Sequence, residues 1–183
     1  GFTIHQLKKD IAAFENISFR LDKGQFLLLK GVNGRGKSTL LRTVYRTYVA
    51  QAGEIMFHSQ HGIIDLARAA DVDISYLRKT EIGFVTQFLV ARPRVTAEDI
   101  VAEPLLDSGV PLHDAREEAR HWLDEFGVKQ ELWGAYPATF SGGEQQKVNL
   151  ARTLIRPRKL LMLDEPTASL DVRAREALIR RLT

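Results

Sequence analysis

The sequence predicts an α/β fold built around a glycine-rich loop, and three observations support this. The segment 31–39 fits the pattern G-x-x-x-x-G-K-[ST] and lies between an apolar run of strand length (25–30) and a run with helical spacing (40–48). A further apolar run of strand length, 159–163, ends in two adjacent carboxylates. Between them the pattern is helical from about residue 95 to residue 154. We therefore expect an α/β domain that carries a helical insert.

The phosphate loop consists of nine candidate nucleotide-binding residues: Gly31, Val32, Asn33, Gly34, Arg35, Gly36, Lys37, Ser38 and Thr39. Its glycines allow backbone conformations in which successive N–H groups point inward and surround anionic oxygens. The helix that begins near Lys37 presents further N–H groups and a partial positive charge to the same oxygens. Lys37 can reach the terminal phosphates, and the Ser38 hydroxyl can ligate Mg²⁺. A glycine-rich turn with a chance lysine is the alternative, and the strand and helix on either side argue against it.

Length and composition are those of one globular domain, with or without an inserted subdomain. The chain has 183 residues, and no run of about 18 apolar residues occurs, so direct membrane insertion is not expected. The absence of cysteine excludes disulfides and cysteine metal sites and is compatible with a cytoplasmic location. The net charge of +3 is mild and spread along the chain, so no nucleic-acid partner is expected.

The amino-terminal part, residues 2–30, is expected to form antiparallel strands. Apolar and polar side chains alternate in 2–4 and 13–21. Asp22-Lys23-Gly24 supplies a turn before the strand 25–30 that enters the phosphate loop.

The next segments continue the alternation of strands and helices. After the first helix, 52–57 and 62–66 are expected to pair as a hairpin that turns around Ser59-Gln60. The segment 81–87 is a further buried strand that ends in a polar residue. The helical region beyond it has a start signal at Thr96.

Within the helical region, two prolines and a glycine mark the expected helix ends. Pro104 and Pro111 are expected to interrupt the helices, and Gly127 is expected to stop one. The charges in 115–126 surround an apolar face and are most simply the solvated side of a helix.

The apolar strand 159–163 ends in Asp164 and Glu165. In open α/β sheets ligands bind at the carboxyl edge of the strands, the edge that also carries the phosphate loop. Mg²⁺·ATP needs an Asp near the water shell of the metal, and Asp164 fits that role. Glu165, one residue on, is expected to be the general base for the attacking water. A strand that simply ends at solvent is the plain alternative for the pair alone.

A second candidate phosphate-binding helix start follows Phe140. Its residues are Ser141, Gly142, Gly143, Glu144 and Gln145. Ser141 can cap the helix, and the two glycines leave backbone N–H groups open. The segment resembles the signature motif of the ATP-binding-cassette (ABC) ATPases. That resemblance implies a phosphate-loop ATPase fold with an antiparallel β subdomain and an inserted helical subdomain. It also implies a head-to-tail dimer, in which each ATP is held by one subunit's phosphate loop and the other's signature.

The resemblance assigns further roles residue by residue. Gln87 matches the family's glutamine that contacts Mg²⁺ and the attacking water. Ser169, Leu170 and Asp171 match the loop that crosses the dimer interface. The adenine-stacking aromatic is expected at Phe2, with Phe14 more suited to the core.

The resemblance covers essentially the whole chain, 1–183, as one cassette domain. It implies a catalytic core with the β subdomain in 1–94 and 156–183, and a helical subdomain in 95–155. The family's switch histidine and its last strands are expected beyond Thr183.

A narrower resemblance includes stretches outside the catalytic motifs. The segments 76–89, 93–95 and 103–111, together with 139–146, are similar to the L subunits of bacterial carbon–phosphorus lyase systems, which break down phosphonates. This implies a cytoplasmic cassette ATPase, a second cassette subunit as homodimer or companion, and the lyase core complex as partners. The alternatives are the ATPase subunit of a membrane exporter or lipoprotein-release transporter, and a nucleotide-dependent scaffold with little turnover. Glu165 argues against the scaffold.

Overall fold

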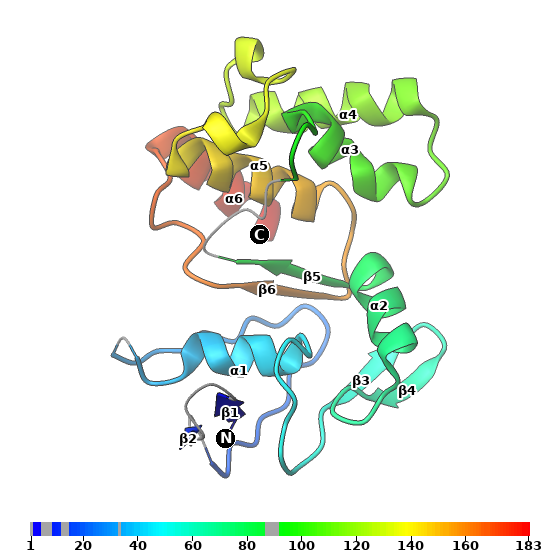
Figure 1. Ribbon diagram of the computed structural model, residues 1–183, viewed down its shortest axis with the longest axis vertical. Coiled ribbons are helices and arrows are strands. Elements are labelled where there is room, and N and C mark those ends of the chain that lie inside the picture. The colour runs from blue at the N-terminus through cyan, green and yellow to red at the C-terminus, as the bar shows by residue number, and fades with distance from the viewer. Residues whose placement is uncertain (1, 5–8, 12–14, 33, 87–91) are drawn as a thin grey trace. The chain divides into compact units, whose positions relative to one another are not determined.

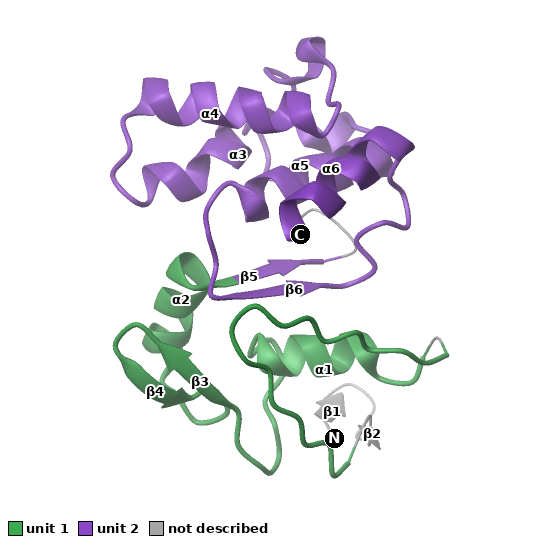
Figure 2. Cartoon of the chain, turned by 180° about the vertical axis from the view of Figure 1, so that it is seen from behind, with its two compact units in different colours: residues 1–82 green, residues 83–183 purple. Residues whose placement is uncertain are grey.

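A computed structural model describes residues 2–4, 9–11, 15–32, 34–86 and 92–183 (Figure 1). The chain divides into two compact units, residues 1–82 and residues 83–183, which are drawn in different colours in Figure 2. Among the described residues, no helix combines the length and the apolar character that a membrane crossing requires.

The first unit contains two short hairpins and two helices. Its elements are β1 (Phe2–Ile4), β2 (Lys9–Ile11), α1 (Lys37–Val44), β3 (Met56–Ser59), β4 (Gly62–Asp65) and α2 (Asp71–Thr80). Strands β1 and β2 pair antiparallel, and so do β3 and β4, with Met56 opposite Asp65 and Ser59 opposite Gly62. The expected second hairpin is therefore confirmed, although its turn lies one residue later than predicted, at Gln60 and His61.

The strands predicted across 13–21 and 25–30 are wrong for the described residues. Residues 15–32 contain the expected turn, with the Gln25 N–H donating to the Asp22 carbonyl over 3.1 Å, but no strand. A strand needs a partner ladder for its backbone groups, and an apolar run alone does not supply one. Without that ladder the side chains are largely exposed, Phe26 by 74% and Leu28 by 73%.

Helix α1 ends in a turn that is tied to the rest of its unit. Arg46 adopts a left-handed conformation (φ 67°), and the backbone bonds from its N–H to Thr43 O and from Thr47 N–H to Arg42 O close a Schellman turn. The Arg46 side chain donates to the Leu66 carbonyl after β4 (3.0 Å). Arg78 of α2 donates twice to the Tyr45 carbonyl, over 3.0 and 2.8 Å. These contacts fix the carboxyl end of α1, and hence the direction of its amino end.

The second unit is mainly helical. Its elements are β5 (Ile82–Val85, of which Ile82 is the last residue of the first unit), α3 (Ala97–Leu106), α4 (Leu112–Glu125), two 3₁₀ turns (Gln130–Leu132 and Pro137–Thr139), α5 (Gly142–Leu154), β6 (Leu160–Leu163) and α6 (Val172–Leu182). The helices enclose an apolar core to which α3, α4, α5 and α6 all contribute, with Val101, Leu123, Phe126, Val148 and Leu178 among its buried side chains. Strand β5 pairs with β6.

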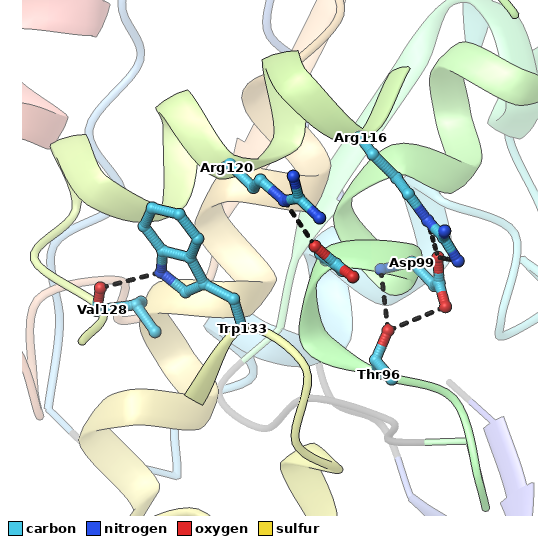
Figure 3. A network of polar contacts seen from close by, with 7 residues as sticks. Thr96, Asp99, Arg116, Arg120, Val128 and Trp133 are labelled. Atoms are coloured by element: carbon cyan, nitrogen blue, oxygen red, sulfur yellow. Dashed lines mark hydrogen bonds and ion pairs between the residues drawn. The ribbon is translucent and has the colours of Figure 1, made fainter. Parts of the chain in front are cut away.

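Polar contacts join α3 to α4 (Figure 3). The Thr96 hydroxyl caps α3 by accepting from the Asp99 N–H, so the predicted start signal is confirmed. Arg116 of α4 donates to the Asp99 carboxylate over 2.8 Å, and Arg120 donates to Glu98 over 2.7 Å. The bond from Arg116 lowers the pKa of Asp99, so this carboxylate stays ionised at neutral pH and keeps its ion pair with α4.

Of the predicted helix ends, two are confirmed and one is wrong. Pro111 is the N-cap of α4, and Gly127 adopts a left-handed conformation (φ 70°) just after α4 ends. Pro104 lies inside α3 instead of breaking it. A proline removes one backbone hydrogen bond from the helix, and burial of Pro104 with its apolar neighbours offsets that loss. Its own carbonyl accepts from Ser108 Oγ and Arg156 Nη1.

Candidate nucleotide site

The phosphate loop meets α1 without a side-chain cap. Gly36 is the N-cap residue in a left-handed conformation (φ 88°), and Gly34 is also left-handed (φ 80°). The first backbone bond of the helix runs from the Leu40 N–H to the Gly36 carbonyl (2.8 Å). No acidic side chain lies in the first turn. The backbone N–H groups of a helix's first turn have no acceptor within the helix, so this end offers donors and a partial positive charge to an anion.

Lys37 folds back over the loop. Its Nζ donates to the Gly31 carbonyl over 2.7 Å and to the Val32 carbonyl over 3.1 Å. The ammonium group therefore lies against the backbone of the loop, where phosphate oxygens can exchange for these carbonyls. Ser38 and Thr39 follow in the first turn and are partly buried. Asn33 lies outside the described residues.

The predicted carboxylate pair sits at the end of β6. The Asp164 N–H donates to the Val85 carbonyl over 2.9 Å, which ties this end to β5, and Asp164 is only 6% exposed. Glu165 is exposed and has a left-handed backbone (φ 49°). That conformation costs a residue other than glycine roughly 1–3 kcal/mol and is concentrated at functional sites. The two adjacent carboxylates therefore differ sharply, one held in the protein and one turned to solvent.

The predicted signature begins helix α5 with a complete capping box. Ser141 Oγ accepts from the Glu144 N–H (3.3 Å), and the Glu144 carboxylate accepts from the Ser141 N–H (2.9 Å) and hydroxyl (2.8 Å). These bonds, led by the one from the Ser141 hydroxyl, lower the pKa of Glu144. Gln145 also bonds within its own chain, donating to the Phe140 carbonyl over 3.1 Å. The predicted helix cap at Ser141 is confirmed.

The two signature glycines have different surroundings. A Cβ added at Gly142 would meet nothing within 4 Å. A Cβ added at Gly143 would lie 2.8 Å from the Ser169 carbonyl oxygen. Gly143 is thus required because the loop 169–171 comes close to it. The signature motif alone does not predict this constraint.

The loop 169–171 leads into α6. Leu170 is buried in the core of the second unit. Asp171 caps α6, with its Oδ1 accepting from the Ala174 N–H over 2.9 Å, and its Oδ2 accepts from Lys147 Nζ over 2.6 Å. Sequence reasoning missed Lys147, although it lies four residues before Ala151 and so shares the apolar face of the helix.

Two further predicted site residues lie wholly or partly outside the described residues. Gln87 lies outside the described residues, as does the side chain of Phe2, whose backbone belongs to β1. Thr86, just before Gln87, accepts through its carbonyl from the Asn149 amide of α5 (3.0 Å). The phosphate loop belongs to the first unit, and Asp164, Glu165 and the signature belong to the second.

Known proteins resemble this chain along most of its length. The model of the ABC transporter family matches residues 14–168. The lipoprotein-releasing system ATP-binding protein LolD of Koribacter versatilis is 40% identical over 177 residues, which cover 94% of this chain and 77% of LolD. The phosphonates utilization ATP-binding protein PhnK of Escherichia coli K12 is 34% identical over 169 residues, which cover 91% of this chain and 66% of PhnK.

Solved structures resemble it as well. The ATP-binding cassette MJ0796, determined as a dimer in a post-hydrolysis state with ADP and Pi, superposes with a TM-score of 0.83. It is 27% identical, and the match covers 93% of this chain and 73% of that one. The family match, the relatives and this structural neighbour agree on the α/β phosphate-loop ATPase fold that the motifs predict. The chain belongs to the ABC transporter family and is an ATPase.

Proposed function

We propose that the chain hydrolyses Mg²⁺·ATP in a head-to-tail dimer, each ATP being held between one phosphate loop and the other subunit's signature. The observation that carries this proposal is the second helix start: α5 has an exposed amino end at Gly142, in a different unit from the phosphate loop. One chain thus offers two helix ends suited to phosphate. The structural neighbour is a dimer bound to ADP and Pi, which supports dimerisation of a nucleotide-bound cassette.

In this proposal the loop residues Gly31 to Thr39 hold the phosphates, with Lys37 on the terminal ones. Ser38 and Asp164 hold Mg²⁺, since hydroxyl and carboxylate oxygens are the donors that this hard cation prefers. The cation supplies charge neutralisation at the transferred phosphoryl group.

The remaining residues are proposed to activate the attacking water, to bind the adenine and to face the partner subunit. Glu165 is the general base for the attacking water, and Gln87 contacts both that water and Mg²⁺. Phe2 stacks on the adenine. The loop 169–171 and the signature residues Ser141 to Gln145 face the partner subunit.

For the assembly that the ATPase drives, we propose a membrane transporter of the lipoprotein-release or exporter type, with the cassette dimer on the cytoplasmic side. The 40% identity to a lipoprotein-releasing ATPase over 94% of this chain supports this candidate.

A second candidate is the ATPase subunit of a carbon–phosphorus lyase system, similar to its L subunit, PhnL, with the lyase core as partner. The basis for this candidate is the resemblance to L subunits inferred from the sequence, which includes stretches of 76–89 and 103–111 outside the catalytic motifs. The 34% identity to PhnK adds a relative from phosphonate utilization.

Complementation separates the two candidates. The full-length protein is produced in one bacterial strain that lacks its lipoprotein-releasing ATPase and in another that lacks its carbon–phosphorus lyase cassette subunits. Restored lipoprotein release supports the transporter, and restored growth on methylphosphonate as the phosphorus source supports the lyase system. Lys37→Ala is the matched control that must fail in both strains. If the parent restores neither strain, both proposed assemblies are rejected, and the conclusion that the chain is an ATPase is unaffected.

A further inference from the structure

Lys147 is a buried lysine that joins three elements of the second unit. It lies on α5, six residues after the N-cap Ser141, and is only 8% exposed. Its Nζ donates to Asp171 Oδ2 over 2.6 Å and to the Gly127 carbonyl over 3.1 Å. One ammonium group thus connects the signature helix, the turn after α4 and the cap of α6.

A second contact lies one turn earlier on α5. The close approach of Gly143 to the Ser169 carbonyl brings the backbone of the signature against the backbone of the loop 169–171. The loop is therefore held at both ends, by backbone packing at Ser169 and by the charged hydrogen bond at Asp171.

The buried charge of Lys147 has its own acceptors. A buried ammonium must be compensated, and Lys147 has a carboxylate and a carbonyl as acceptors. The Asp171 carboxylate makes two contacts: one oxygen caps α6, and the other accepts from Lys147. The bond from Lys147 is the main cause that lowers the pKa of Asp171, so this carboxylate stays charged at neutral pH.

We propose that Lys147 is a positioning residue that locks the signature start and the loop 169–171 into one rigid piece. This inference rests on the proposed dimer, in which both elements face the partner subunit. Locked together, they reach the partner in a fixed relative position, and ATP binding at the signature is transmitted to the loop. Lys147 itself touches no nucleotide.

The test uses a Glu165→Gln background, in which slow hydrolysis preserves the ATP-bound dimer. The variants are Lys147→Met, Lys147→Arg, Asp171→Asn and the Lys147→Met, Asp171→Asn double variant. Asn is as good an N-cap as Asp, so Asp171→Asn removes the charge but keeps the cap. Arg180→Met, which removes an exposed cation from α6, is the matched control.

Light scattering measures the ATP concentration that gives half-maximal dimerisation, and a fluorescent ATP analogue measures nucleotide affinity of the monomer. We expect Lys147→Met to raise the dimerising concentration about tenfold and to leave monomer affinity within about twofold. Lys147→Arg recovers most of the effect, which simple loss of packing would not predict. Asp171→Asn should raise the dimerising concentration to a similar extent. The double variant should raise it no further than either single variant, since both substitutions break the same bond.

The outcomes separate the inference from the proposed function. If the Glu165→Gln parent does not dimerise with ATP, the proposed dimer fails, and the inference fails with it. If the parent dimerises and both Lys147→Met and Asp171→Asn match it, only the positioning role is overturned. Additive losses in the double variant also overturn it. If Lys147→Met does not fold, the positioning role is judged from the dimerising concentrations of Lys147→Arg and Asp171→Asn.

Discussion

Two helices of this protein begin in the way that suits a phosphate group, yet their first turns are built differently. Helix α1 starts at a left-handed glycine, with no side-chain cap and with Lys37 folded over the loop. Helix α5 starts at Ser141 in a closed capping box, with the Glu144 carboxylate already bonded there. The first start leaves its donors to an external anion. At the second start, Ser141 and Glu144 already bond to each other, so only the backbone N–H groups beside Gly142 are left for an external anion.

The difference indicates a division of labour. An uncapped start with its own cation can bind nucleotide within one subunit. A start that already carries a carboxylate attracts an anion less, so the signature is expected to add to a site that another phosphate loop has formed.

The largest effect expected from this comparison separates binding from hydrolysis. Lys37→Ala should lower ATP affinity at least about tenfold, since it removes a charged contact to the phosphates. Glu165→Gln should keep ATP binding while turnover falls roughly 10²-fold or more, as expected for a general base. Equilibrium binding of a fluorescent ATP analogue and phosphate release measure the two quantities. Unchanged turnover in Glu165→Gln would remove Glu165 from the catalytic role.

The next effect tests the signature end alone. Gly142→Asp places a carboxylate at the start of α5, where a Cβ meets nothing within 4 Å. An acidic group there favours the isolated helix, so thermal stability should hold or rise slightly. The same charge repels the γ-phosphate, and ATP-dependent dimerisation in light scattering should weaken by about tenfold or more.

A Gly142→Asp protein that dimerises with ATP as well as the parent would contradict the composite site. Gly143→Asp is the poorer probe, because its side chain would also collide with the Ser169 carbonyl of its own chain.

A smaller effect compares the neighbouring glycines directly. Gly143→Ala should destabilise the protein by roughly 1–3 kcal/mol, the usual range for overpacking, because its Cβ would lie 2.8 Å from Ser169 O. Gly142→Ala should change the free energy of unfolding by no more than about 0.5 kcal/mol. Urea unfolding measures both. Equal costs at the two positions would mean that the loop 169–171 yields without strain.

The parts of this molecule that the sequence could predict are those encoded locally. The glycine pattern of 31–39, the caps at Thr96 and Ser141 and the end of α4 at Gly127 depend on nearby residues, and each appears where expected. The carboxylate pair was visible because an apolar strand leads into it. Such features follow from short-range backbone chemistry.

What escaped prediction depends on residues distant in the sequence. Pro104 stays within α3 because tertiary packing compensates a local defect. The segment 25–30 has strand composition, but a ladder partner decides whether it becomes one. Lys147 was overlooked because its acceptors, Gly127 and Asp171, lie 20 and 24 residues away. The apolar spacing around Lys147 could have indicated burial, but not its partners.

The contrast between the two helix starts also predicts a difference in pH dependence. Hydrogen bonds from the Ser141 hydroxyl and N–H lower the pKa of Glu144 below its ordinary value of 4.5. The unfolded chain therefore binds a proton at higher pH than the folded one, and stability rises with pH through this group. Its contribution is complete above about pH 4.5 and is lost as the pH falls through the folded-state pKa. The start of α1 has no ionisable cap and adds no such dependence.

The smallest expected effect is the removal of this pH dependence at the signature. Glu144→Gln keeps a capping box, because Gln serves at that position as well as Glu, but it cannot titrate. Asp65, Asp99 and Asp171 also have lowered pKa values, so both proteins should lose stability in acid. Between about pH 5.5 and 3.5, one unit either side of the ordinary pKa of a glutamate, the parent should lose more stability than the variant. Urea unfolding at several pH values measures this difference. Parallel curves for parent and variant would mean that the Glu144 carboxylate is as free in the folded protein as in the unfolded chain. In that case the Glu144 side chain would not close the start of α5, and the contrast with α1 would rest on the Ser141 cap.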